Sequence, residues 1–140
     1  MKERSFMKPK DDLRPEAAVR WLEKAKHNLD SAYLNHRHGG YTDTTCYFTH
    51  QTVEIVLKAF LVYYSIRFKK IHILPTLLEA CKAKDKEFQQ FEEDCKILNN
   101  YYVETKYPLD LPTNYPKEQA EEAIEKAEEI FEFVKGKLEQ

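Results

Sequence analysis

Residues 46–59 read CYFTHQTVEIVLKA, inside a segment that we expect to form one helix, capped by Thr42 or Asp43 and ending near Ser65. Because a helix turns by about 100° per residue, a narrow polar stripe follows one line along this segment. The stripe starts at Tyr47 and continues through Gln51, Glu54, Lys58 and Ser65. Apolar side chains flank it on both sides (Phe48, Ile55, Ala59 and Val62; Cys46, Val53, Leu57, Phe60 and Tyr64). A helix with two apolar flanks normally lies at the centre of a helical bundle.

The polar stripe has two interpretations. In the first, it is a solvent-facing seam in which Glu54 and Lys58 form an ordinary i, i+4 ion pair, worth a few tenths of a kcal/mol. In the second, it is the polar floor of a groove that meets a ligand or a second subunit. The residue pattern of this helix leaves both interpretations open.

The rest of the chain predicts further helices. One begins at Pro15 and ends near Gly39, a short one runs from Pro75 to Cys81, a fourth carries Phe88 to Tyr102, and the last covers Lys117–Leu138. Strand-like alternation is absent, and the sequence has only three glycines. We therefore expect an all-α, antiparallel four- or five-helix up-and-down bundle over residues 14–140, preceded by a flexible N-terminal arm, residues 1–13. Three prolines predict an extended crossing loop before the last helix: Pro108, Pro112 and Pro116.

Composition and charge exclude several classes of protein. The net charge of −2 argues against a protein that coats nucleic acid through a general basic surface. The longest apolar run has six residues, Ala59 to Tyr64, too short for a membrane span or a signal peptide, so we expect a cytoplasmic protein. No pattern of metal ligands or phosphate-binding glycines is present, and we expect no cofactor. The cysteines are expected to be small buried hydrophobes in a reducing compartment: Cys46, Cys81 and Cys95.

Several segments together resemble the HEPN domain, the helical nucleotide-binding domain of prokaryotes and higher eukaryotes. Residues 46–59 resemble a helix with an aromatic residue followed by Gln-Gln-Ala-x-Glu-x-x-Leu-Lys-Ala, with His50 in place of the first Gln. Ile71 to Leu74 resembles Thr-His-Asp-Leu, with Ile73 in place of Asp. Tyr102 to Pro108 resembles Tyr-x-x-x-Arg-Tyr-Pro, with Lys106 in place of Arg. The resemblance covers residues 15–138.

The resemblance implies a helical bundle that dimerises and binds a nucleotide or RNA. It also implies a partner, a minimal nucleotidyltransferase, in a two-component system of the toxin–antitoxin kind. On this interpretation Lys58 and Lys106 neutralise phosphate, Glu54 holds Lys58 in place, and Tyr107 stacks on a base or packs against the partner. The full set of candidate ligand- or partner-binding residues is Tyr47, Gln51, Glu54, Lys58, His72, Lys106 and Tyr107.

A second function is open, because some members of this family are metal-independent ribonucleases with an Arg and a His four to six residues apart. Arg67 and His72 match that spacing, as do Arg20 and His27, which we expect on the surface of the first helix. In this resemblance Lys106 stands at the position of the Arg late in the domain, and no His follows it, so we expect no catalytic residues. The alternative is an endoribonuclease that acts through Arg67 and His72.

Two interpretations without catalysis are also open. His72 can have a structural role, in which it caps a helix or bonds a carbonyl. The whole chain has a third option, a ligand-free structural dimer with Tyr63 and Tyr101 as its seam.

Overall fold

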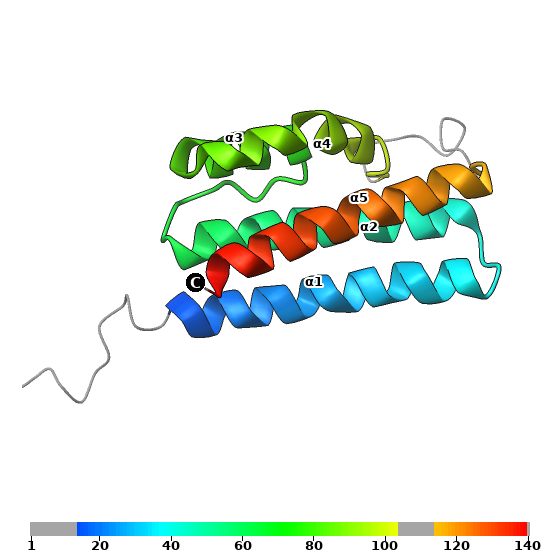
Figure 1. The fold of residues 1–140 in the computed structure, drawn as a ribbon, viewed down its shortest axis with the longest axis horizontal. Coiled ribbons are helices and arrows are strands. Elements are labelled where there is room, and N and C mark those ends of the chain that lie inside the picture. The colour runs from blue at the N-terminus through cyan, green and yellow to red at the C-terminus, as the bar shows by residue number, and fades with distance from the viewer. Residues whose placement is uncertain (1–13, 104–113, 140) are drawn as a thin grey trace, which may run out of the picture.

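The computed structural model describes residues 14–103 and 114–139, and within them the chain is a bundle of helices. The elements are α1 (Arg14–Arg37), α2 (Thr42–Tyr63), α3 (Leu74–Lys84), the 3₁₀ helix η2 (Lys86–Phe91), α4 (Glu92–Asn99) and α5 (Lys117–Leu138). The three long helices α1, α2 and α5 lie alongside one another, and α3 and α4 form a shorter layer over them (Figure 1). The described residues contain no strand, so the predicted all-α bundle is confirmed.

Helix α2 lies at the centre of this bundle, as its two apolar flanks predict. It packs against α1, α3, α4 and α5. On α1 the buried residues are three alanines and one leucine, namely Ala18, Ala25, Ala32 and Leu29. On α5 the acidic residues lie on the opposite, exposed face, as expected for a solvated surface (Glu121, Glu122, Glu125, Glu128 and Glu129). The amphipathic pattern therefore positions both outer long helices correctly.

Two local predictions are wrong. Thr42 does not cap α2 with its side chain, since it is the first helical residue and its hydroxyl instead donates to the Tyr115 carbonyl oxygen at 2.8 Å. The fourth predicted helix is not one α-helix, because Phe88 lies in the 3₁₀ helix η2 and α4 runs only from Glu92 to Asn99. Phe88 and Phe91 are both buried, since a three-residue spacing suits one face of a 3₁₀ helix.

The connector between α2 and α3, residues 64–73, folds back along α2. Helix α2 ends where Ser65 adopts a left-handed conformation with φ of 55°, and the Ile66 amide then donates to the Leu61 carbonyl at 2.9 Å. Phe68 lies beside Lys58, and His72 lies beside Glu54. The connector therefore runs in the opposite direction to α2 and covers the polar stripe.

The three cysteines are buried and free, in agreement with the prediction that they are small core residues. In the part of the chain that the structure describes, no helix is long and apolar enough to span a membrane. The same residues contain no grouping of side chains suited to hold a metal ion. The N-terminal arm, Pro108, Pro112 and the candidate residues Lys106 and Tyr107 lie outside the described residues.

Candidate functional site

The polar stripe of α2 is buried at its centre. Residues Glu54 and Lys58 are 5% and 7% exposed, because the connector lies over them. The interpretation as a solvent-facing seam is therefore wrong at these two positions, and it holds only for Ser65, which is exposed at the end of the helix. Tyr47 and Gln51 precede Glu54 on the same line and are half-buried.

Glu54 is the centre of the site. Its Oε2 accepts a hydrogen bond from Lys58 Nζ at 2.8 Å and lies 2.9 Å from His72 Nδ1. A carboxylate oxygen accepts hydrogen bonds, so Nδ1 of His72 is the donor. Taking a carboxylate and an ammonium out of water is costly, and the pair persists because each group finds its opposite charge. Oε2 of Glu54 thus joins three of the predicted site residues, Glu54, Lys58 and His72.

His50, one turn before Glu54 on α2, is fully buried and supports the same group of residues. Its Nε2 donates to the backbone carbonyl oxygen of His72 at 2.9 Å. Burial lowers the pKa of His50, so its ring stays neutral near pH 7.

The ring of Tyr102 stacks on both imidazole rings, that of His50 and that of His72. The ring centroids are 5.2 Å apart on the His50 side and 4.9 Å apart on the His72 side, with interplanar angles of 28° and 18°. We call these five residues the polar cluster: His50, Glu54, Lys58, His72 and Tyr102. Three elements supply them, namely α2, the connector and the segment after α4.

His72 is the member of the cluster that meets solvent, since 41% of its side-chain surface is exposed. Its Nδ1 is engaged by Glu54, and no described residue bonds its Nε2. The side chain therefore neither caps a helix nor bonds a carbonyl, which corrects the structural role considered for it. The backbone carbonyl of His72 accepts a separate hydrogen bond from His50 Nε2.

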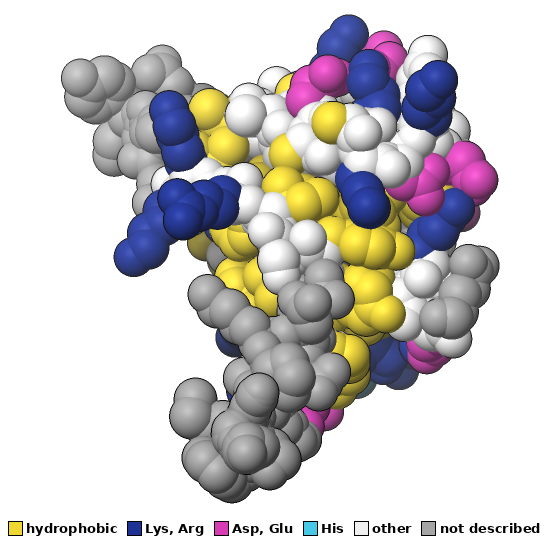
Figure 2. Space-filling view, turned by 90° about the vertical axis from the view of Figure 1, so that its left-hand side faces the viewer, with side chains coloured by type: hydrophobic (Ala, Val, Ile, Leu, Met, Phe, Trp, Pro, Cys, Tyr) yellow, Lys and Arg dark blue, Asp and Glu magenta, His cyan; other side chains and the backbone are white. Residues whose placement is uncertain are grey.

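The connector that carries His72 is basic. Arg67, Lys69 and Lys70 are all exposed, while the neighbouring Ile66 and Phe68 are half-buried. Residues 64–73 contain no Asp or Glu. Figure 2 looks onto the end of the bundle where α2 ends, and there Lys and Arg side chains, interspersed with some Asp and Glu, lie around a central patch of apolar side chains. The neighbourhood of His72 in the chain is therefore suited to an anion.

The sequence matches a family model described as the HEPN domain over residues 18–137. The chain belongs to the HEPN domain family. Its fold is similar to that in the crystal structure of ST0689, an archaeal HEPN homologue, with a TM-score of 0.70 and 23% sequence identity. That match covers 86% of this chain and 97% of the other, and at this identity it shows a common fold. No curated protein matches the chain.

Two members of the polar cluster in this HEPN chain are not identified as candidates from sequence. His50 stands out only as a substitution within a motif, and Tyr102 only as the first residue of a motif. The sequence signal for His50 is its spacing of four residues from Glu54, since residues at i and i+4 meet on one face of a helix. Nothing local to Tyr102 indicates that it stacks on two imidazole rings.

Other candidates of the HEPN chain lie apart from the cluster. Arg20 and His27 are exposed on α1, as expected. Tyr101 is only 4% exposed, so the prediction that it forms an exposed seam with Tyr63 is wrong. Tyr101 is held inside by Tyr115, whose ring centroid is 5.1 Å away, and its hydroxyl accepts from Gln119 at 2.8 Å.

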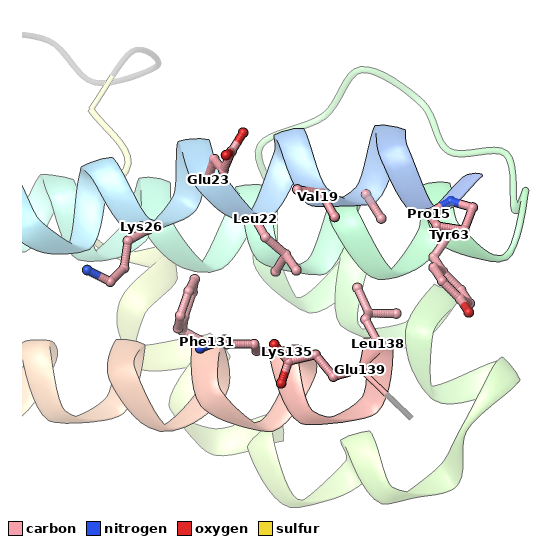
Figure 3. Close-up of a pocket in the computed structure, with 11 residues that line it drawn as sticks. Pro15, Val19, Leu22, Glu23, Lys26, Tyr63, Phe131, Lys135, Leu138 and Glu139 are labelled. Atoms are coloured by element: carbon pink, nitrogen blue, oxygen red, sulfur yellow. The ribbon is translucent and has the colours of Figure 1, made fainter. Parts of the chain in front are cut away.

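An apolar groove between α1 and α5 was not predicted. It has a volume of about 320 Å³, and Tyr63 lies at one end of it. Leu22 of α1 and Phe131 and Leu138 of α5 point into it, as Figure 3 shows. This groove contains none of the members of the polar cluster, so the two features are separate.

Proposed function

We propose that this HEPN domain binds a nucleotide or an RNA end through His72 and the basic connector, and that it does so without catalysis. The observation that carries the proposal is the Glu54–His72 hydrogen bond of 2.9 Å. A bond at Nδ1 fixes the ring and directs the other ring nitrogen toward a ligand in solvent. Exposed cations on the same connector supply the charge that a phosphate group requires.

The roles within the stripe follow from burial. The Lys58 side chain is 9% exposed and is engaged by Glu54, so it stabilises the buried carboxylate that orients His72. Arg67, Lys69 and Lys70 are exposed and are the groups positioned to meet phosphate. Of these, Arg67 offers two parallel N–H donors, the geometry that favours phosphate oxygens.

Binding is tested with a short fluorescein-labelled RNA that carries a 5′-phosphate, by fluorescence anisotropy at several salt concentrations. The triple variant R67A/K69A/K70A is expected to bind more weakly. Its log Kd is expected to depend less steeply on log salt, by about one for each phosphate that the variant no longer neutralises. The control variant K24A/K96A/K117A removes three exposed lysines elsewhere and changes the net charge equally. Equal weakening in the two variants would reject the connector as the binding surface.

We further propose that the domain forms a homodimer and associates with a minimal nucleotidyltransferase in a two-component, toxin–antitoxin-like system. Membership of the HEPN family supports this proposal. Light scattering after size-exclusion chromatography measures the mass of the protein alone and mixed with a nucleotidyltransferase encoded next to it. A monomer of 16.7 kDa that gains no mass on mixing would reject both parts of this proposal.

The alternative function is a metal-independent endoribonuclease, and the same Glu54–His72 pair favours it. Because the Glu54 carboxylate bonds Nδ1 of His72, Nε2 of the same ring can take the proton of an attacking 2′-hydroxyl and act as a general base. Incubation of RNA with the protein in EDTA, beside the variants H72A and R67A, distinguishes the two functions. Cleavage that both substitutions abolish would replace the binding function by this alternative.

A further inference from the structure

His50 contacts His72 in two ways although it is itself fully buried. It bonds the backbone carbonyl of His72 through Nε2 at 2.9 Å, and it stacks on Tyr102, which also stacks on the His72 ring. A ligand in solvent has no access to a side chain with 0% exposure. Any effect of His50 on binding must therefore pass through its neighbours.

The hydrogen bond fixes which nitrogen of His50 carries the proton. A carbonyl oxygen only accepts, so Nε2 carries the hydrogen, and the neutral ring has a lone pair on Nδ1. That Nδ1 lies 3.8 Å from Glu54 Oε1, and both atoms are buried without a hydrogen-bond partner. Two facing acceptors without a donor are unfavourable, and an apolar side chain at residue 50 would remove one of them. Packing alone would therefore favour an apolar side chain at residue 50. What the histidine adds is its hydrogen bond to the backbone carbonyl of His72 in the connector.

The connector depends on such contacts, because it has few backbone hydrogen bonds of its own. Within residues 67–72, all of them described, one hydrogen bond joins two backbone groups, from the Ile71 amide to the Lys69 carbonyl at 2.8 Å. At the end of the connector the Leu74 amide donates to Asn99 Oδ1 at 3.0 Å. Residue 72 is therefore held by side chains of α2 and by Tyr102, and the position of its ring follows from them.

We propose that His50 is a positioning residue, which holds the backbone and ring of His72 so that Nδ1 of His72 bonds Glu54 and Nε2 faces the ligand. This inference rests on the proposed function, because it takes His72 as the group that meets the ligand. It adds a residue that acts on the site from inside the core. It also predicts one tautomer for each ring: hydrogen on Nε2 in His50, and hydrogen on Nδ1 in neutral His72.

The tautomer of His72 is measured by ¹⁵N NMR of protein labelled at histidine, with signals assigned by the variants H50Q and H72A. A free neutral imidazole in water favours hydrogen on Nε2, so an Nδ1–H signal from His72 reports the contact with Glu54. In wild type we expect Nδ1–H. In H50F, which keeps an aromatic ring but has no donor, we expect His72 to shift toward the Nε2–H form of the free ring.

Two further variants separate positioning from stability. H50Q keeps an N–H donor at the place of Nε2, and we expect it to retain the Nδ1–H form of His72. V134A removes two methyl groups from a fully buried site on α5, and we expect it to lower stability without changing the His72 signal. Retention of Nδ1–H in folded H50F, or an equal change in V134A, would overturn the inference.

RNA affinity gives the second measurement. H50F is expected to bind the 5′-phosphorylated RNA about fivefold more weakly than wild type, the size of effect expected for one neutral hydrogen bond. H50Q is expected to lie close to wild type, and an H50F affinity equal to that of wild type would contradict the inference. Wild-type protein that binds no RNA would reject the proposed function, while the tautomer of His72 would still decide the role of His50.

Discussion

Glu54→Gln is the most informative single substitution, because it removes one charge from the polar cluster and keeps the shape of the side chain. In wild type, Glu54 Oε2 accepts from Lys58 at 2.8 Å, and the two side chains are 6% and 9% exposed. The amide leaves the Lys58 ammonium buried without its counter-charge, which lowers the free energy of unfolding by about 3–5 kcal/mol. An amide N–H can donate to the unpartnered Nδ1 of His50 and recover about 1 kcal/mol. We expect a net loss of about 3 kcal/mol, or a fall in Tm of roughly 10 °C.

Urea denaturation followed by far-ultraviolet circular dichroism measures this loss, and the chain supplies a matched control. Lys26 and Asp30 form an ion pair of the same spacing at 3.0 Å, but their side chains are 55% and 52% exposed. Asp30→Asn should therefore cost less than about 0.5 kcal/mol. The double variant E54Q/K58M should recover most of the stability that E54Q removes, because no buried charge remains unpaired. Equal losses for E54Q and D30N, or a double variant no more stable than E54Q, would refute the reasoning.

Three further predictions concern the core and the turn after α2. Burial raises the pKa of Cys46 to about 11 and of Cys95 to about 12, and it raises the pKa of Cys81 as well. A thiol reagent at pH 8 should therefore label none of the three cysteines in native protein and all three in urea, and rapid labelling of native protein would contradict this. Burial also raises the pKa of Tyr33 and Tyr101 to about 12. An unfolded tyrosine releases its proton near pH 10, so the free energy of unfolding should fall between pH 10 and pH 12; in urea titrations the fall should be smaller for Y101F, and an equal fall would exclude a contribution from Tyr101. Ser65→Gly should raise the free energy of unfolding by up to about 1 kcal/mol, because glycine relieves the positive φ of 55°; a clear loss in urea denaturation would show that the serine side chain is needed there.

The sequence predicts the long helices well because their apolar residues repeat with the helical period. The bounds of α5 agree with Lys117–Leu138, and the line through Gln51, Glu54 and Lys58 describes a real face of α2. The spacing of Phe88 and Phe91 suits either an α-helix or a 3₁₀ helix, so the break before α4 was not predictable from periodicity.

The covering of the stripe was not predictable, because it depends on the path of the connector. Ser65 carries a left-handed turn that glycine normally signals, so no residue type indicated the reversal. Once the chain turns back, His72 meets Glu54 across 18 residues of sequence, a contact that no local pattern contains. The family motifs identified His72 as a candidate, and its partners became visible only in the fold.

The connector that carries His72 can open locally while the helical bundle stays folded. Residues 67–72 have one backbone–backbone hydrogen bond, whereas the helices share one continuous hydrophobic core. A segment of this kind opens by local fluctuation at a lower free energy than global unfolding. Amide hydrogens of the connector should thus exchange with solvent long before those of α2, although His72 and Glu54 are in direct contact. One inserted residue between Phe68 and His72 should move the imidazole away from its carboxylate and leave the helices intact, so the Glu54–His72 contact depends on the length of this segment.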